Sequence, residues 1–405
     1  MPTLLQINVD ANNGSNGGVA RDIGRLVQEK GWNSYIAYSR RVSPCTSTLI
    51  KIGNKLDIIT HVFFSRILDN HGLCSVLATK RLIKKILKIQ PDIIHLHNIH
   101  GYFLNYKILF NYLKKSRIPV VWTLHDCWPY TGHCSHFISA DCYKWKTGCY
   151  NCPLKKKYPK SLIFDFSERN YRIKKECFTS LERMTITTVS HWMGRQLDDS
   201  FLNKYKIHVV LNGVDTSVFK YKESDVRKKY NINAKYLLLG VAANWSKGKG
   251  LYDYYELSKH LDDDFKIVLI GMTPEQISEL PNGIIGIKRT ENLEELVRFY
   301  SASDIILNLS YAESFGLTTV EGMACGTPGI VYDNTASPEL LSPETGIVVP
   351  TGNIEAVINA IQHITSKGRN VYSAACRKRV LEFFDKDKKY LEYYNIYKQI
   401  IDNNQ

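Results

Sequence analysis

Short apolar runs alternate with stretches of helical periodicity along this chain, and the whole pattern occurs twice. The apolar runs are 3–9, 34–38, 91–97, 119–125 and 185–190 in the first half, then 236–242, 265–271, 304–310 and 328–332 in the second. Such runs are typical of parallel strands covered by helices on both faces of a sheet. The sequence therefore predicts an α/β protein made of two Rossmann-like, doubly wound domains.

Chain length sets the number of domains. A chain of 405 residues is too long for one ordinary core, which favours two domains. We expect an N-terminal domain over 1–205 with a cysteine-rich insert at 127–160, a C-terminal domain over 206–380, and terminal helices over 381–405. The segment 209–215 is the expected hinge. Ligands of doubly wound sheets bind beyond the carboxyl ends of the strands, so we expect a cleft between the domains.

The sequence predicts neither a membrane span nor a secretion signal. No apolar run approaches the roughly 18–20 residues that cross a bilayer. The first residues lack a basic region and a cleavage site. We therefore expect the protein in the cytoplasm. Because that compartment keeps thiols reduced, we expect the ten cysteines to form no disulfides.

The positive charge is confined to one half of the chain. The net charge is +14, yet residues 1–205 hold 30 Lys and Arg against 14 Asp and Glu, whereas residues 206–405 hold 23 against 25. The basic clusters are 80–88, 114–117, 155–157 and 172–175. They are compatible with solvated helix faces, nucleic acid, a phosphorylated acceptor or an anionic membrane surface. We favour the membrane surface and expect no nucleic-acid partner.

Two glutamates, with seven residues between them, follow the strand predicted at 304–310. Glu313 falls in the loop at the end of that strand, and Glu321 falls in the helix that follows. Ser314, Phe315, Gly316 and Leu317 would form the start of this helix, whose free N–H groups can hold a diphosphate. Glu321 could accept hydrogen bonds from two neighbouring hydroxyls. A generic strand–loop–helix with two solvated glutamates is the alternative.

Four cysteines fall close together in the first half. Cys134, Cys142, Cys149 and Cys152 include one Cys-x-x-Cys pair, and four thiolates suit a closed tetrahedral zinc site. We predict a structural zinc there. Free core cysteines, His133 or His136 as a substitute ligand, and a redox role for the last pair are the alternatives.

Three other groups could contribute to a site. Gly17 and Gly18 fit a loop where the backbone approaches a ligand closely, on the acceptor side. His95, His97 and His100 could suggest a metal, but we favour core or cleft-lining histidines. The run 262–264 fits an Asp-x-Asp metal pattern, but its place before a strand favours a solvated turn.

These motifs resemble the retaining glycosyltransferases of family 4, which have the GT-B fold. The similarity includes the paired glutamates, Gly326-Thr-Pro328, His125-Asp126, 212–215 and Lys249-Gly250. A narrower similarity over 122–153 is to the colanic-acid, O-antigen and capsule polysaccharide transferases. It implies that Glu313 contacts the transferred sugar, Glu321 binds the ribose, and His125 contacts the donor. Lys249 would neutralise the diphosphate leaving group, so that catalysis needs no cofactor.

The sequence departs from the family pattern at one position. The family places an arginine five residues before the lysine, and Asn244 stands there instead. Lys247 is the candidate to replace that arginine and to neutralise the second phosphate. In the alternative, Lys247 is an ordinary turn lysine that points to solvent. Asn244 and Lys247 complete the expected donor-binding set.

The resemblance implies a specific reaction. A sugar would move from a UDP- or GDP-sugar, bound by the C-terminal domain, to a polyisoprenyl-diphosphate-linked glycan bound by the N-terminal domain. The enzyme would lie peripherally at the inner face of the membrane. Retention would arise by front-side attack, in which the departing phosphate takes the acceptor proton. A sugar-nucleotide epimerase or hydrolase of the same fold, and a zinc-bearing nucleic-acid-binding protein, are the alternatives.

Overall fold

The computed structural model describes residues 1–403. The chain forms two compact units, each with its own parallel sheet. Unit 1 comprises Met1–Val210 together with the chain from Tyr390 onward, and unit 2 comprises Leu211–Lys389. The first crossing between the units falls inside the expected hinge 209–215. The second falls inside the last helix, so the C-terminal residues belong to unit 1.

Unit 1 is built on a seven-stranded sheet. Its order is β3-β2-β1-β4-β5-β6-β7, and every neighbouring pair is parallel. The strands are β1 (Thr3–Ile7), β2 (Asn33–Tyr38), β3 (Thr48–Lys51), β4 (Ile93–Leu96), β5 (Val120–Leu124), β6 (Met184–Thr188) and β7 (Lys206–Val209). The strands β1, β4 and β5 are buried along their whole length, as expected for a sheet covered on both faces.

Helices follow these strands in the order that a doubly wound fold requires. They are α1 (Gly14–Glu29), α2 (Lys55–Leu68), α3 (Val76–Ile89), α4 (Tyr106–Ser116), α5 (Ser167–Phe178) and α6 (His191–Asp198). The cysteine-rich insert between β5 and α5 contains only short 3₁₀ turns, η1 (Trp128–Tyr130), η2 (Ile138–Ala140) and η3 (Lys144–Lys146).

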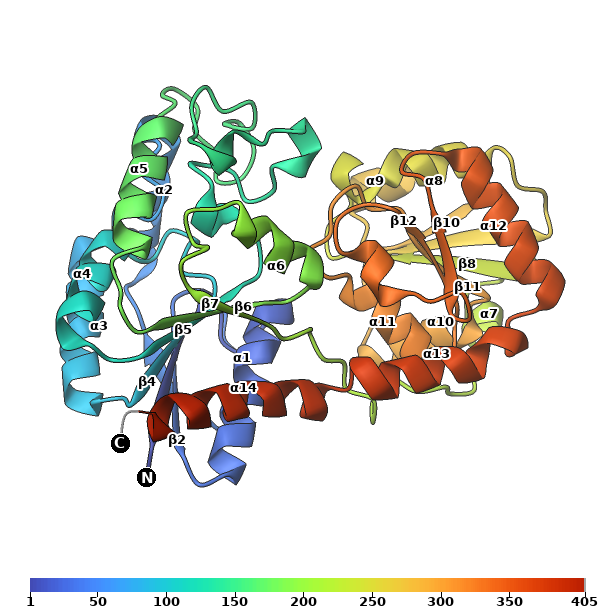
Figure 1. Ribbon diagram of the computed structural model, residues 1–405. Helices are drawn as coiled ribbons and strands as arrows, with labels where there is room; N and C mark the ends of the chain where they lie inside the picture. Colours follow the sequence, from blue (N-terminus) through green and yellow to red (C-terminus); the bar gives the residue numbers. More distant parts are fainter. Residues whose placement is uncertain (404–405) are drawn as a thin grey trace. The chain divides into compact units, whose positions relative to one another are not determined.

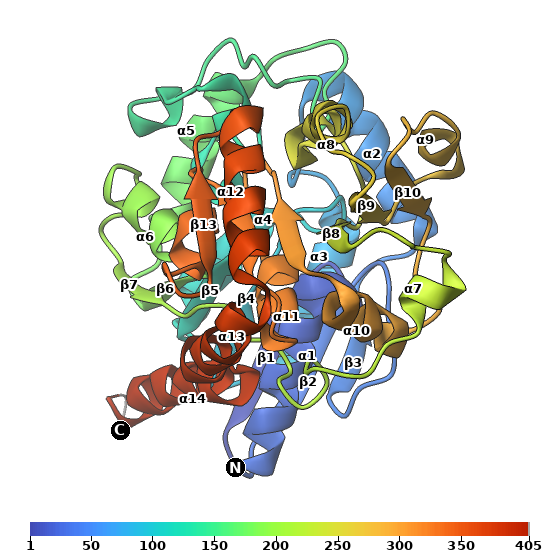
Figure 2. The same ribbon diagram turned by 90° about the vertical axis from the view of Figure 1, so that its right-hand side faces the viewer.

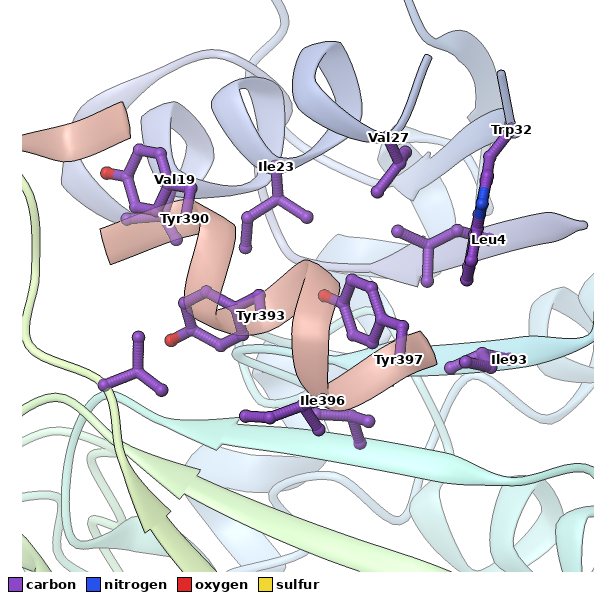
Figure 3. Close-up of a cluster of buried hydrophobic side chains, with 12 residues drawn as sticks. Leu4, Val19, Ile23, Val27, Trp32, Ile93, Tyr390, Tyr393, Ile396 and Tyr397 are labelled. Carbon is purple, nitrogen blue, oxygen red and sulfur yellow. The ribbon is translucent and has the colours of Figure 1, made fainter. Parts of the chain in front are cut away.

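The C-terminal helix completes the core of unit 1. Helix α14 (Lys386–Asp402) runs beside α1 (Figure 1), and its side chains lie between α1 and the strands β1 and β4 (Figure 3). The Tyr397 hydroxyl lies 2.6 Å from His95 Nδ1, and the other ring nitrogen of His95 lies 2.7 Å from Thr123 Oγ1. His95 is thus a core histidine held by hydrogen bonds, as we favoured over a metal ligand.

Unit 2 repeats the architecture with six parallel strands. The order is β10-β9-β8-β11-β12-β13. The strands are β8 (Tyr236–Val241), β9 (Phe265–Ile270), β10 (Ile284–Ile287), β11 (Ile305–Asn308), β12 (Gly329–Tyr332) and β13 (Gly346–Val349). The helices are α7 (Val226–Lys229), α8 (Leu251–Ser258), α9 (Pro274–Ser278), α10 (Leu293–Ala302), α11 (Leu317–Ala324), α12 (Ile354–Lys367) and α13 (Asn370–Phe383), with 3₁₀ turns η4 (Lys247–Lys249) and η5 (Ser337–Leu340). Helix α12 packs on β13 (Figure 2).

Helix α1 begins earlier than the sequence indicated. Gly17 and Gly18, expected in a loop, lie inside the helix, which starts at Gly14. The extended Asn13 precedes it, and the backbone N–H of Asn12 donates to the Gly17 carbonyl at 3.1 Å. This contact folds the Asn/Gly run, which resembles a loop in sequence, back onto the first turn.

Among the described residues, no helix is long and apolar enough to cross a membrane.

Candidate active site

The two residues expected to act on the donor meet in unit 2. The ammonium of Lys249 and the carboxylate of Glu313 form an ion pair, with 2.6 Å between Nζ and Oε1. They are 64 positions apart in sequence. About a third of the Lys249 side chain is exposed, so the charge can reach a ligand. The structure thus brings together the predicted phosphate-binding cation and sugar-binding carboxylate.

Close packing fixes the turn that carries Lys249. Gly250 has φ of +72°, and a Cβ there would lie 2.0 Å from the carbonyl oxygen of Leu309. Only glycine combines this backbone conformation with so close an approach. The N–H of Tyr311 donates to the Gly248 carbonyl at 3.0 Å. The lysine turn is therefore attached to the residues that follow β11, and these lead directly to Glu313.

The backbone of Glu313 is held on its other side by the loop after β12. Its N–H donates to Thr335 Oγ1 at 2.8 Å, and its carbonyl accepts from the Ala336 N–H at 3.3 Å. No motif or spacing in the sequence points to Thr335, which follows a different strand. These bonds hold the backbone of Glu313 in place and do not involve its carboxylate.

The helix after Glu313 begins later than predicted. Ser314, Phe315 and Gly316 precede the helix, which starts at Leu317, because Gly316 has φ of +105°, outside the helical region. Phe315 is buried, whereas Ser314 and Leu317 are half-buried. Within the part of the chain that the structure describes, no side chain caps the first turn of α11, and no acidic residue lies in that turn. The N–H of Thr319 donates to the Gly316 carbonyl at 3.1 Å, and the N–H groups of Leu317 and Thr318 at the start of the helix are those that an anion can bind.

Glu321 lies one turn into α11 and is bound by a single side chain. The hydroxyl of Tyr300 donates to Glu321 Oε2 at 2.8 Å. Burial raises the pKa of Glu321 to about 7, although this hydrogen bond lowers it in part. The carboxylate therefore accepts one strong hydrogen bond and has capacity for others, as the binding of two hydroxyls requires.

The remaining predicted donor residues lie on the surface near the lysine turn. Asn244 and Lys247 are both exposed. Between them Trp245 is buried, and its indole N–H donates to the Ile270 carbonyl at 2.9 Å. Lys247 belongs to the same 3₁₀ turn as Lys249. Trp245 anchors the segment and leaves its two polar neighbours facing solvent.

In unit 1, a chain of hydrogen bonds determines the protonation of His125. Gln6 donates its amide N–H to the Ala20 carbonyl, so its side-chain oxygen accepts from His97 Nε2 at 3.0 Å. The Nδ1 of His97 is then the acceptor for His125 Nε2 at 3.2 Å. Burial lowers the pKa of His125 to about 4, which makes this side chain neutral at pH 7. His125 thus carries its proton on Nε2 and its lone pair on Nδ1.

The next residue contacts a buried histidine. The carboxylate of Asp126 lies 2.8 Å from His100 Nε2. Burial alone would raise the pKa of Asp126, but His100 and the N–H of Trp128 lower it to about 2. His100 is therefore a buried partner of Asp126, in agreement with the expectation of a core histidine.

The four predicted zinc ligands are free thiols in the structure. Cys134 is buried, and Cys142, Cys149 and Cys152 are half-buried. The thiols of Cys134 and Cys152 are hydrogen-bonded, and the N–H of Gly132 donates to Cys149 Sγ at 3.1 Å. Among residues 1–403, no three or more His, Cys, Asp or Glu side chains are arranged to hold a metal ion. The zinc site stays a prediction.

Comparison with known proteins identifies the family. The model for Glycosyltransferase Family 4 matches residues 18–218, and the model for Glycosyl transferases group 1 matches residues 222–379. The chain is a family 4 glycosyltransferase. The two matches together cover both units and include the paired glutamates, the lysine turn and His125.

Curated relatives of this family 4 glycosyltransferase cover nearly the whole chain. WcaC of Escherichia coli K12, described as a colanic acid biosynthesis glycosyl transferase, is 23% identical over 89% of each chain. A 41.2 kDa protein of the cps region of Klebsiella pneumoniae is 26% identical over 94% of this chain and 96% of its own.

Solved structures establish the GT-B fold. Sucrose-phosphate synthase from Thermosynechococcus elongatus matches all of this chain and all of its own, with a TM-score of 0.72 and 17% identity. HepE from Anabaena, solved in complex with UDP, matches with a TM-score of 0.67 and 14% identity, over 98% of this chain and all of its own. The family 4 enzyme is thus two parallel-sheet α/β domains of the GT-B type.

Proposed function

We propose that this glycosyltransferase moves a sugar from a UDP- or GDP-sugar to a lipid-linked glycan in surface polysaccharide biosynthesis, with retention of anomeric configuration. The ion pair between Lys249 and Glu313 carries the proposal. It places a cation on the carboxylate of the residue that lies four positions before the uncapped start of α11. The cation matches the diphosphate of a sugar nucleotide, and the carboxylate matches the hydroxyls of the neutral sugar attached to that diphosphate.

The charges of unit 2 suit a sugar nucleotide. Lys249 and the N–H groups of the first turn of α11 offer positive charge to the diphosphate, and they oppose the negative charge that grows on it as the glycosidic bond breaks. When the donor binds, Glu313 releases Lys249 and binds the sugar. Its carboxylate then faces the positive charge that develops on the anomeric carbon. Glu321 holds the ribose hydroxyls one turn further on.

Retention is proposed by front-side attack. The acceptor hydroxyl approaches the anomeric carbon on the side that the diphosphate leaves, and its proton passes to the departing phosphate oxygen. The new glycosidic bond forms as the bond to the phosphate breaks, so charge and atoms balance without an external base. His125, neutral and with a lone pair on Nδ1, contributes a hydrogen bond to the donor.

The relatives support the proposed acceptor. WcaC is named for colanic acid biosynthesis, and the Klebsiella relative is encoded in a cps region. Two structures of Anabaena HepE are complexes with UDP-glucose and with UDP and glucose. We infer from these names a nucleotide-sugar donor and a polysaccharide precursor as acceptor.

Replacing Glu313 tests the proposal. Glu313→Gln keeps the side-chain shape and removes the charge, so we expect kcat to fall by about 100-fold or more. Glu355→Gln makes the same change at an exposed position of α12 and should leave kcat unchanged. The readout is nucleoside diphosphate release, with the anomeric configuration of the product assigned by NMR. Wild-type turnover in Glu313→Gln, or an inverted product, would contradict the proposal.

A structural zinc is a second, separate proposal for the cysteine-rich insert. Cys134 and Cys152 are already in contact. Burial raises the pKa of the Cys149 thiol to about 11, and the Gly132 N–H that it accepts lowers this pKa in part. Lys174 is buried beside them and donates to the carbonyls of Trp128 and Thr131, with no carboxylate bound to it in the described contacts. Burial lowers the pKa of the Lys174 ammonium to about 7, and thiolates on a metal would favour its charged form. Binding requires the thiols to move closer together.

A further inference from the structure

Helix α2 of unit 1 exposes its apolar side chains and buries polar ones. Leu56, Ile59, Phe63 and Phe64 are exposed by 69%, 64%, 56% and 40%. The first three recur at spacings of three and four, which places them along one face. The buried residues of α2 are His61 and Ser65. A helix that served only to cover the core would show the opposite arrangement.

Polar contacts hold this helix in place. Asn54 and Asp57 form a capping box at its start. The ring of His61 accepts the Gly72 N–H at 3.0 Å and lies 2.8 Å from Ser75 Oγ. The outward direction of the apolar face is therefore fixed by specific hydrogen bonds on the opposite side of α2.

A second segment extends the apolar face. Leu162, Ile163 and Phe164 are exposed by 50%, 57% and 45%. The N–H of Leu162 donates to the Arg66 carbonyl at 2.7 Å, and that of Phe164 donates to the Ile67 carbonyl at 3.3 Å. The segment 162–164 is thus attached to the C-terminal end of α2. We call the seven residues 56, 59, 63, 64 and 162–164 the apolar patch.

Positive charge accompanies the apolar patch. The segments 55–68 and 155–164 hold six cations and one carboxylate, Asp57. The cations are Lys55, Arg66, Lys155, Lys156, Lys157 and Lys160. The ammonium of Lys155 donates to the Ile163 carbonyl at 3.1 Å, which places one cation directly on the patch. Two copies of this surface would repel each other, whereas an anionic lipid surface matches it in both charge and polarity.

We propose that the apolar patch enters the acyl–headgroup boundary of an anionic membrane while the surrounding lysines and Arg66 bind lipid headgroups. This proposal rests on the proposed function, which supplies the lipid-linked acceptor. It adds to that function the part of the chain that reaches the membrane. Its apolar side chains give binding a component that salt does not screen, and the cations give a component that salt removes.

Vesicle sedimentation tests the patch. Wild type should bind phosphatidylcholine vesicles that contain phosphatidylglycerol, and the double variant Ile59→Ser/Phe63→Ser should bind them at least about tenfold more weakly, because each inserted apolar side chain adds severalfold to affinity. The matched control is Leu293→Ser/Val371→Ser, which removes two equally exposed apolar residues from unit 2. The control should bind as wild type does.

A charge variant separates the two components. Lys156→Glu/Lys157→Glu should weaken binding at low salt and lose that difference at high salt, while Lys228→Glu/Lys378→Glu in unit 2 should have little effect at any salt. Undiminished vesicle binding by Ile59→Ser/Phe63→Ser would overturn the proposal. So would self-association of wild type without lipid that the same variant abolishes, because a second copy would then cover the patch.

The failure of the patch and of the proposed function can be told apart. Nucleotide-sugar binding should be equal in wild type and in both patch variants, since none of the changed residues belongs to the donor site. Vesicle binding that depends on the patch, in a chain that binds no sugar nucleotide, would contradict the transferase proposal alone. Normal donor binding with vesicle binding unaffected by Ile59→Ser/Phe63→Ser would contradict the patch alone.

Discussion

Glu321 makes nucleotide affinity depend on pH near neutrality. Burial raises the pKa of its carboxyl to about 7 in the folded chain. Ribose hydroxyls donate hydrogen bonds, and protonation of one Glu321 oxygen removes an acceptor, so they bind the ionised carboxylate far more tightly than the protonated one. One pH unit below the pKa about a tenth of the group is ionised, and one unit above it about nine-tenths is ionised. Nucleotide affinity should therefore rise about tenfold across that interval.

Calorimetry measures this effect and its proton balance. Titration of UDP or GDP at the pKa, in two buffers of different ionisation enthalpy, should show release of about half a proton per nucleotide from Glu321. The terminal phosphate of the nucleotide also titrates near this pH. Glu321→Gln retains that phosphate contribution, so the difference between wild type and variant isolates the carboxyl. Identical pH profiles for the two proteins would refute the assigned role.

The same group affects stability, and the sign follows from its raised pKa. Below the unfolded value near 4.5, both states are protonated. As pH rises toward 7, the unfolded state releases its proton and the folded state keeps it, so wild type loses stability relative to Glu321→Gln by about 3 kcal/mol. Urea unfolding at several pH values measures this. A difference that stays constant with pH would show that the folded pKa is not raised.

Three further predictions concern the lysine turn, the histidine relay and the cysteines. Gly250→Ala should destabilise the chain by at least about 2 kcal/mol and lower donor affinity, because its Cβ would meet the Leu309 carbonyl at a positive φ; Gly248→Ala, with nothing closer than 3.8 Å, is the matched control, and equal melting temperatures would contradict this. His97→Phe should change the nitrogen NMR shifts of the His125 ring, because that ring loses its acceptor; unchanged shifts would exclude the relay. Elemental analysis should find about one zinc per chain, and mild EDTA should leave activity intact; protein purified without chelator and free of metal would exclude the zinc proposal.

Much of the fold could be predicted from local pattern. The central strands β1, β4, β5, β8 and β11 are long apolar runs and were all predicted. The edge strands β3, β7, β10 and β13 were not predicted, because the apolar residues of each form a short run beside glycine or lysine and not a longer continuous one. Pairing with a neighbour, not composition, makes these segments strands. Helix α2 was also missed, since its apolar residues face outward.

The donor site was predictable in its members but not in its contacts. Residue type and family resemblance pointed to Glu313, Glu321 and Lys249. The contacts that fix them come from Thr335 and Tyr300, which lie on other elements and have no spacing signal. The loop reading of Gly17 was wrong because Asn12 folds back onto the helix that contains it.

Donor binding by wild type and by Lys249→Ala tests the central claim most directly. The measurement is the affinity for each member of a panel of UDP- and GDP-sugars, with bound nucleotide identified by mass spectrometry. Wild type should bind one donor saturably, and Lys249→Ala should bind it at least about tenfold more weakly, because a phosphate loses its charged partner. Lys259→Ala, an exposed lysine of the same unit, should bind as wild type does. No binding of any sugar nucleotide, or equal binding by wild type and Lys249→Ala, would contradict the assignment of the donor site to Lys249, Glu313 and α11.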